Sequence, residues 1–138
     1  GNFAKSPRGG EKFRAKRIAQ IANDIPKIKV INGESKGDLL ILGWGSTQGA
    51  INAAVEKLFE KGCKVANAHI RYLNPFPSNL GDIIKNYKKV LIPEINLGQL
   101  RLLIRAKFLV DAQGLNVIGG QPLKVSAIIE AAEELLKP

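Results

Sequence analysis

The sequence of 138 residues contains one cysteine, one histidine and no methionine. With Cys63 as the single cysteine, an internal disulfide is excluded and a reducing, cytoplasmic compartment is expected. With His69 as the single histidine, the chain has no histidine pair and no credible cysteine–histidine cluster for a metal ion. The absence of methionine and the glycine at position 1 indicate a processed chain or a fragment of a longer one.

Long hydrophobic runs are also missing. No apolar stretch approaches the roughly 18 residues that a membrane-spanning helix needs, and no apolar segment follows the basic N-terminus as it does in a secretory signal. We therefore expect no membrane association. The hydrophobic fraction of 45% and the charged fraction of 24% are typical of a globular chain. A chain of this length can bury the core of one domain without disulfides or metals.

Aromatic residues make up only 6% of the chain, and acidic residues are outnumbered by basic ones, 12 against 21. The excess of positive charge is concentrated in residues 1–20, where six basic residues accompany Glu11 alone. Such an arm can bind nucleic acid or an acidic partner. Only Phe3 and Phe13 interleave with the bases, however, whereas nucleic-acid readers usually use more aromatic stacking. We therefore favour a basic linker with a short helix over 1–23, without nucleic-acid binding.

From residue 24 to residue 138, apolar runs alternate with amphipathic stretches, which predicts one α/β domain with a mostly parallel sheet between helices. Tyr87, Phe59 and Leu103 are expected on the buried stripes of helices. The predicted strands are 28–32, 39–43, 64–70, 89–93 and 115–118, and the predicted helices are 47–60, 79–87, 98–108 and 124–136.

Three of the predicted strands end in turns rich in glycine, proline and polar residues. The turns begin at Trp44, Arg71 and Glu94. If the strands are parallel, the turns share the carboxyl edge of the sheet, where ligands and partners bind in open α/β folds. Two interpretations of Glu94 remain: a structural ion pair with Arg71, which we favour, or a catalytic acid stabilised beside a helix N-terminus.

The first turn, Gly43-Trp44-Gly45-Ser46-Thr47-Gln48-Gly49, joins a strand to a helix. Such a turn can approach a phosphate group, which indicates a possible phosphate- or nucleotide-binding module. The alternative, which we favour, is that Ser46 or Thr47 caps the helix and the glycines only fill a tight turn. The glycine spacing is one residue longer than the dinucleotide fingerprint, and Arg71 stands where an acid is expected, so NAD is disfavoured.

His69 could join a catalytic triad only with Ser46 and an acid such as Glu94, but the G-x-S-x-G signature of a hydrolase is missing. We expect His69 to be a partly buried group with its hydrogen bonds satisfied. The next loop, Tyr72-Leu73-Asn74-Pro75-Phe76-Pro77, is stiffened by its prolines. It is equally compatible with a contact surface and with a simple cover for the edge of the sheet.

Taken together, three motifs resemble the C-terminal part of the α subunit of 2-oxoacid:ferredoxin oxidoreductases, with most similarity to the 2-oxoglutarate type. They are Gly43-Trp44-Gly45-Ser46-Thr47, His69-Ile70-Arg71-Tyr72-Leu73-Asn74-Pro75-Phe76-Pro77 and Pro93-Glu94-Ile95-Asn96-Leu97-Gly98-Gln99-Leu100. The resemblance runs from about residue 24 to residue 136. It implies the C-terminal fold of transketolase: a three-layer α/β/α domain with five strands, mostly parallel, and one antiparallel edge strand, for which 28–32 is the candidate.

The resemblance also implies an oxidative decarboxylation that turns a 2-oxoacid and coenzyme A into an acyl-CoA, CO2 and reduced ferredoxin. Thiamine diphosphate, Mg2+ and iron–sulfur clusters would be held by the N-terminal domain of the same subunit, the β subunit or other subunits. This domain is expected to bind no cofactor and to be inactive alone. Its role would be assembly and walling of the active-site region, and ferredoxin would be a partner of the whole complex. The candidate interface residues are Trp44, Gly45, Ser46, Thr47, His69, Arg71, Tyr72, Asn74, Phe76, Glu94, Asn96 and Gln99.

Overall fold

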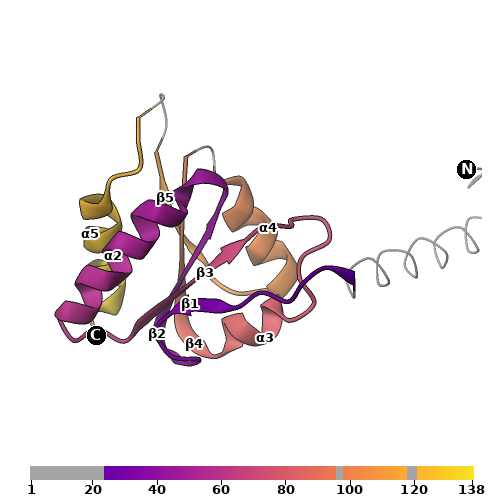
Figure 1. Cartoon of the computed structure of the whole chain (residues 1–138), viewed down its shortest axis with the longest axis horizontal. Coiled ribbons are helices and arrows are strands. Elements are labelled where there is room, and N and C mark those ends of the chain that lie inside the picture. Colours follow the sequence, from indigo (N-terminus) through magenta and orange to yellow (C-terminus); the bar gives the residue numbers. More distant parts are fainter. Residues whose placement is uncertain (1–23, 96–97, 118–120) are drawn as a thin grey trace, which may run out of the picture.

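The computed structural model describes residues 24–95, 98–117 and 121–138, and the strands of this part form one sheet of five (Figure 1). Their order across the sheet is β1-β3-β2-β4-β5. The edge strand β1 is antiparallel to β3, and the other neighbouring pairs are parallel, as predicted. The strands are β1 Val30–Asn32, β2 Gly37–Trp44, β3 Val65–Ile70, β4 Tyr87–Glu94 and β5 Gln113–Asn116. The predicted linker over 1–23 lies outside the described residues.

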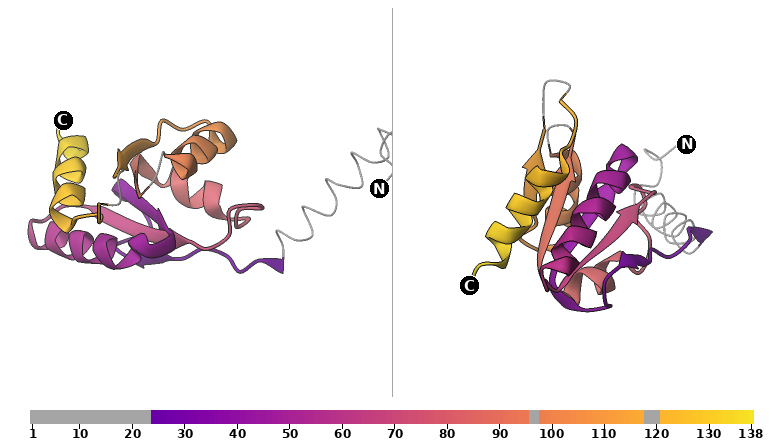
Figure 2. Two further views of the ribbon diagram at one scale, coloured as in Figure 1. Left: turned by 90° about the horizontal axis from the view of Figure 1, so that it is seen from above. Right: turned by 60° about the vertical axis from the view of Figure 1, so that its left-hand side comes forward.

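Helices cover both faces of the sheet, which confirms the three-layer architecture. One hydrophobic cluster joins the sheet to α2 and α5, which lie side by side in Figure 2. The other cluster joins the opposite face to α3 and α4. The helices are α2 Gln48–Glu60, preceded by the 3-10 turn η2 Gly45–Thr47, α3 Leu80–Lys85, α4 Gln99–Phe108 and α5 Val125–Leu136.

The continuous apolar run of β2 is explained by its central place in the sheet. Leu39 and Ile41 face α2 and α5, whereas Leu40 and Leu42 face α3 and α4. All four side chains are fully buried. A strand covered on both faces needs apolar residues at every position, because successive side chains point to opposite faces.

Four predictions of element boundaries or of burial are wrong. Tyr87 opens strand β4 instead of closing a helix, since α3 ends at Lys85, and the Tyr87 hydroxyl donates to the carbonyl of Glu34. Phe59 and Leu103 fit apolar stripes by spacing, yet they are 42% and 47% exposed. Their helices bury narrower faces than the spacing allows. The last predicted strand lies two residues earlier, as β5 over Gln113–Asn116.

Three asparagines fix the antiparallel edge strand. The Asn32 Nδ2 group of β1 donates to Oδ1 of Asn52 at 3.1 Å and to Oδ1 of Asn67 at 3.0 Å. The Nδ2 group of Asn67 donates to Oδ1 of Asn52 at 2.8 Å. Asn67 is only 1% exposed, and a buried polar side chain is tolerated when it is hydrogen-bonded. The network ties β1, α2 and β3 together, and no local pattern in the sequence predicts it.

Candidate functional site

The three predicted turns do share the carboxyl edge of the sheet. Strands β2, β3 and β4 are neighbours and run parallel, so the turns after Trp44, Ile70 and Glu94 leave the sheet on one side. Strands β3 and β4 lie on opposite sides of β2. The boundary between β2 and β4 is therefore the point at which the strand order reverses, and open α/β folds bind ligands in the crevice at such a point.

On the α4 face of this edge, polar groups are hydrogen-bonded to one another. The indole Nε1 of Trp44 donates to Glu94 Oε1 at 3.2 Å. The same Oε1 accepts the backbone N–H of Leu100 at 2.7 Å, and Oε2 accepts that of Arg101 at 3.2 Å. Glu94 is only 1% exposed. Its carboxylate therefore caps the first turn of α4, where unpaired N–H groups and the helix dipole favour a negative charge.

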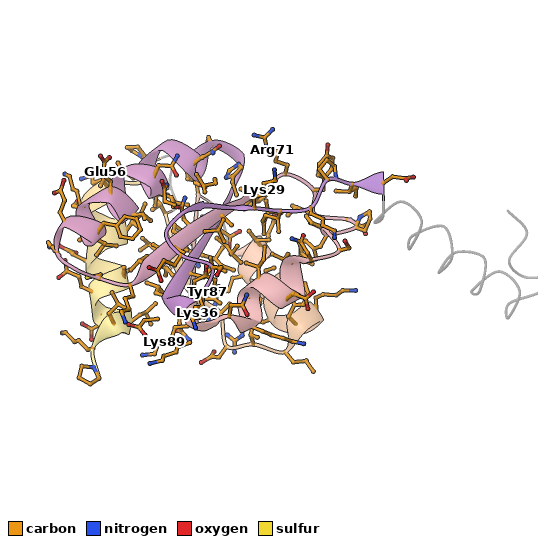
Figure 3. The ribbon with its side chains drawn as sticks, turned by 60° about the horizontal axis from the view of Figure 1, so that its bottom comes forward. Lys29, Lys36, Glu56, Arg71, Tyr87 and Lys89 are labelled. Carbon is orange, nitrogen blue, oxygen red and sulfur yellow. The ribbon has the colours of Figure 1, made fainter. Side chains whose placement is uncertain are left out.

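The expected ion pair between Glu94 and Arg71 is wrong. Arg71 is exposed, and none of the salt bridges formed by the described part of the chain includes it. Its side chain points away from the ribbon in Figure 3. Glu94, the last residue of β4, has its side chain on the face covered by α4, where it accepts from the first turn of that helix. Arg71 comes directly after the last residue of β3 and is exposed. The Glu94 carboxylate is engaged in capping and is buried, which does not suit a catalytic acid.

On the α2 face of the same edge, Gly43 of β2 pairs in register with His69 of β3. A Cβ atom at Gly43 would lie 2.5 Å from Ile51 Cδ1 and 2.8 Å from Thr47 Oγ1, so helix and strand pack closely here. The His69 Nδ1 atom is buried without a hydrogen-bond partner among the described residues. The pKa of His69 is lowered by burial and, to a smaller extent, by the positive charge of Arg71. His69 is partly buried as predicted, but its hydrogen bonds are not all satisfied.

The glycine-rich turn has a structural explanation. Gly45 adopts a φ of 65°, a left-handed conformation that favours glycine. The Thr47 hydroxyl donates to the Trp44 carbonyl at 2.9 Å and makes no cap to α2, so the predicted side-chain cap by Thr47 is absent. Ser46 is exposed. Close packing at Gly43 and backbone conformation at Gly45 account for these glycines without a bound phosphate.

The proline-rich loop after β3 has two different aromatic residues. Tyr72 is 46% exposed, whereas Phe76 is half-buried and packs on Phe108 of α4 with the ring centroids 5.9 Å apart. Phe76 thus anchors the loop to α4, and Tyr72 remains available for contacts. Asn74 and, across the edge, Gln99 are also exposed. Asn96 lies outside the described residues.

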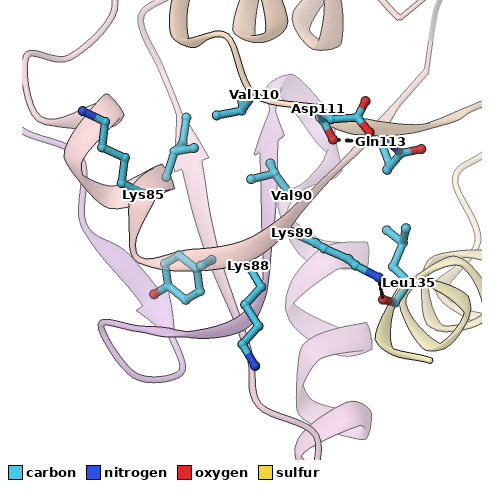
Figure 4. Close-up of a pocket in the computed structure, with 10 residues that line it drawn as sticks. Lys85, Lys88, Lys89, Val90, Val110, Asp111, Gln113 and Leu135 are labelled. Atoms are coloured by element: carbon cyan, nitrogen blue, oxygen red, sulfur yellow. Dashed lines mark hydrogen bonds between the residues drawn. The ribbon is translucent and has the colours of Figure 1, made fainter. Parts of the chain in front are cut away.

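A cavity of about 470 Å³ lies at the opposite, amino edge of the sheet (Figure 4). Lys85, Lys88 and Lys89 contribute to its lining. The Nζ of Lys89 donates to the carbonyl of Leu135 at 2.6 Å, where it neutralises the C-terminal end of α5. The Nζ of Lys88 lies 3.3 Å from Oδ1 of Asp38. Both lysines therefore have structural partners, and the cavity is distant along the strands from the three predicted turns.

The described ranges, 24–95, 98–117 and 121–138, include no group of three or more histidine, cysteine, aspartate or glutamate side chains placed to hold a metal ion. Cys63 is half-buried. These residues do not fit an iron–sulfur cluster, which needs about four thiolates, or a Mg2+ site built from carboxylates. Within the same ranges, every helix is too short or too polar to cross a bilayer.

The fold defines a transketolase C-terminal-type α/β domain. A split-gene transketolase, solved as an inactive beta4 tetramer, superposes with a TM-score of 0.64 and 16% identity, over 80% of this chain and 41% of that chain. At this identity the likeness concerns the fold alone. Residues 37–128 match the family model described as pyruvate:ferredoxin oxidoreductase core domain II, and the chain belongs to this family.

Two relatives indicate which type of oxidoreductase within this family the chain is similar to. The 2-oxoglutarate oxidoreductase subunit KorA of Mycobacterium tuberculosis is 46% identical over 96 residues, which make up 70% of this chain and 15% of that protein. A 2-oxoglutarate:ferredoxin oxidoreductase from Magnetococcus marinus, solved with 2-oxoglutarate, coenzyme A and succinyl-CoA bound, superposes with a TM-score of 0.83 and 28% identity. That match covers 96% of this chain and 24% of the other. The resemblance to the α subunit is thereby confirmed, and the chain spans less than a quarter of either relative.

Proposed function

We propose that this chain acts as a non-catalytic domain of a 2-oxoacid:ferredoxin oxidoreductase that uses 2-oxoglutarate. The proposal is supported by the KorA relative and by the similar structure that holds 2-oxoglutarate, coenzyme A and succinyl-CoA. In the whole enzyme, 2-oxoglutarate and coenzyme A would give succinyl-CoA and CO2. The two electrons released would reduce two ferredoxins, each carrying one electron away.

The main support for a non-catalytic role is that Glu94 serves as a helix cap. This carboxylate, at the carboxyl edge, is buried and shared between the Trp44 indole and the first turn of α4. The side chains exposed at this edge include Ser46, Arg71 and Tyr72. Such residues suit contacts with neighbouring domains and the wall of a substrate channel more than bond-making chemistry.

The cofactors and partners follow from the family. Thiamine diphosphate, Mg2+ and iron–sulfur clusters would be bound by other parts of the enzyme, and coenzyme A would enter as a co-substrate. The partners of this domain would be the N-terminal domain of the same α subunit and the β subunit. Ferredoxin would meet the assembled complex.

The test uses the whole oxidoreductase with alanine at Tyr72 and Arg71. We expect the double variant to lower 2-oxoglutarate-dependent ferredoxin reduction or the yield of assembled complex by about tenfold, since exposed tyrosine and arginine are frequent binding hot spots. Phe59 of α2 is a matched control, because it is 42% exposed against 46% for Tyr72. Unchanged assembly and activity in the double variant would refute the edge as a contact surface.

A second measurement examines the chain alone. Calorimetry against coenzyme A, NADP and ATP at millimolar concentration should show no binding, because packing and turn geometry already explain Gly43 and Gly45. Binding that is abolished by changing Ser46 would instead support a free-standing phosphate-binding module at the helix N-terminus.

A further inference from the structure

Helix α4 has apolar side chains on two faces. Leu100 and Ile104 are fully buried in the core, and Phe108 packs against it. Leu102 and Leu103 nevertheless point outward, with 62% and 47% of their surface exposed. Ala106 is exposed as well, and Leu109, directly after the helix, is 89% exposed. We call these outward residues the leucine face: Leu102, Leu103, Ala106 and Leu109.

The spacing makes the leucine face continuous. Within the helix, Leu102, Leu103 and Ala106 lie at intervals of one and three residues, which places them on one side of α4. Leu109 stands three residues beyond Ala106, directly after the helix ends at Phe108. The sequence carries a signal for this second face, since six of the eleven residues from 99 to 109 are leucine, isoleucine or phenylalanine. A helix that buries only one stripe needs fewer large apolar residues.

Leu109 adds an independent observation. It adopts φ 54° and ψ 38°, the left-handed conformation, and its N–H donates to the Arg105 carbonyl at 3.0 Å. Helices usually place glycine in this position, because a side chain there is strained. A leucine that is both strained and almost fully exposed contributes little to the folded chain itself. With 89% of its surface exposed, its side chain is free to contact a partner.

The charges around the leucine face are positive. Helix α4 contains Arg101, Arg105 and Lys107 and no acidic residue. Arg101 is held by its Nε bond to the Ala112 carbonyl, and Arg105 lies 3.5 Å from Asp111, an exposed and weak pair. A second copy of this chain would bring like charges together, which is unfavourable. The complementary surface is an apolar patch with carboxylates at its rim.

The leucine face also adjoins the carboxyl edge. Helix α4 starts at that edge, where Glu94 caps its first turn. Near its other end, Phe108 contacts Phe76 of the loop that carries the exposed Tyr72. The leucine face therefore extends the surface to which the proposed function already assigns contacts.

We propose that the leucine face of α4 docks against an apolar, acidic-rimmed patch on another part of the same oxidoreductase. This inference rests on the proposed function, because it takes its partner from the whole enzyme. Leu102, Leu103 and Leu109 supply the apolar centre of the contact. Arg105 and Lys107 face the carboxylates of the partner.

The first test is a labelling footprint in a Cys63→Ser background, with single Leu103→Cys, Leu109→Cys and Phe59→Cys variants. Maleimide labelling is compared between the chain alone and the assembled oxidoreductase. We expect labelling at the two leucine positions to slow by about tenfold or more on assembly, because a docked surface excludes the reagent. The exposed position on α2 should change by less than about twofold. Equal rates at the leucine positions in both forms would overturn the proposal.

The second test addresses the chemistry of the partner. Leu103→Glu places a negative charge toward a negative rim, whereas Leu103→Lys does not, so we expect the glutamate variant to weaken assembly about tenfold more than the lysine variant. Equal weakening of assembly by the two variants would overturn the proposal that the partner's rim is acidic. Concentration-dependent dimerisation of the chain alone, lost in both variants, would identify a second copy as the occupant and also overturn the proposal.

A third variant gives opposite results in the two states. Leu109→Gly removes the strain and should raise the Tm of the chain alone by roughly 3 °C. The same change should loosen the assembled enzyme, measured as a lower salt or urea concentration for dissociation. A variant that stabilises both states would contradict docking. If the wild-type enzyme does not reduce ferredoxin with 2-oxoglutarate but the footprint appears, only the proposed function fails.

Discussion

The two faces of the sheet meet the carboxyl edge in different ways. On the α4 face, the polar atoms at the end of β2 and β4 are paired with one another: the Trp44 indole and two N–H groups of α4 all donate to Glu94. On the α2 face, Gly43 makes room for Ile51 and Thr47, and the neighbouring His69 Nδ1 is buried without a partner among the described residues. One face is closed by hydrogen bonds and the other by close packing.

This difference shows that one edge can serve two purposes. A carboxylate that accepts three hydrogen bonds fixes the start of α4, and with it the direction of the exposed leucines. On the α2 face the asparagine network lies further back along β3, and the edge itself depends on the absence of a Cβ atom at Gly43. Changes on the α4 face should therefore act through hydrogen bonds, and changes on the α2 face through volume or protonation.

The largest effect is expected for Glu94→Ala. The change leaves the N–H groups of Leu100 and Arg101 without an acceptor in a buried position, which should lower the free energy of unfolding by about 3 kcal/mol. Urea denaturation of the purified chain measures it. Glu94→Gln should cost less, because one oxygen remains, and the exposed Glu56 gives a matched control for loss of a carboxylate. Equal stability of the two alanine variants would contradict the capping role.

On the packed face, Gly43→Ala should come next, at about 2 kcal/mol of lost stability. The added Cβ would approach Ile51 Cδ1 to 2.5 Å and Thr47 Oγ1 to 2.8 Å, and both atoms are in buried residues. Gly49→Ala, at the start of α2, is the nearby control: beyond the helix's own backbone, no described atom lies within 4 Å of its Cβ position, and alanine favours a helix. Thermal denaturation should show opposite signs for the two. A neutral change at Gly43 would show that the α2 face is less tightly packed than the structure indicates.

A smaller effect is expected for Trp44→Phe, which keeps a ring but loses the Nε1 bond to Glu94 at 3.2 Å. We expect a loss of about 1 kcal/mol, the usual size for one hydrogen bond. A double-mutant cycle with Glu94→Ala, which removes the acceptor of the indole, measures the coupling between the two side chains. Fully additive losses in urea denaturation would mean that the indole does not contribute to the cap.

The smallest effect concerns pH and the α2 face. Burial, and secondarily Arg71, lowers the pKa of His69, so the folded chain takes up a proton less readily than the unfolded chain does. The stability linked to His69 is complete above its ordinary pKa of about 6.5 and falls as the pH drops from there toward the lowered value. His69→Gln should remove this part of the pH dependence, and no other histidine in the chain obscures the comparison. An unchanged slope between pH 7 and 5 would contradict the shift.

Much of the fold could be predicted from local patterns. The run Leu39–Leu42 is apolar at every position, which is typical of a strand covered on both faces, and Gly62, with φ 80°, ends α2 where expected. Tyr87 was assigned wrongly because it lies three residues after Ile84, a spacing that fits a helix as well as the start of a new strand. Local spacing does not distinguish the two.

The candidate site was predicted less completely. That Ser46, Arg71 and Glu94 share one edge followed from three strands and their turns. The polar contacts could not be predicted in this way, because the bond from Trp44 to Glu94 and the asparagine network at β1 join residues far apart in the chain. The exposure of Leu103 likewise depends on how distant elements pack. Residue types alone favoured an ion pair with Arg71, because opposite charges were the only visible reason for contact.

The sequence by itself determined the succession of strands and helices and the placement of the three turns on a common side, because hydrophobic periodicity and turn residues are local properties. Only the tertiary structure decided to which face each side chain of that edge turns. Side chains alternate along a strand, so their faces become fixed only when distant strands pair in register, as Gly43 does with His69. The helices that then cover each face determine which polar atoms find partners and which leucines remain outside.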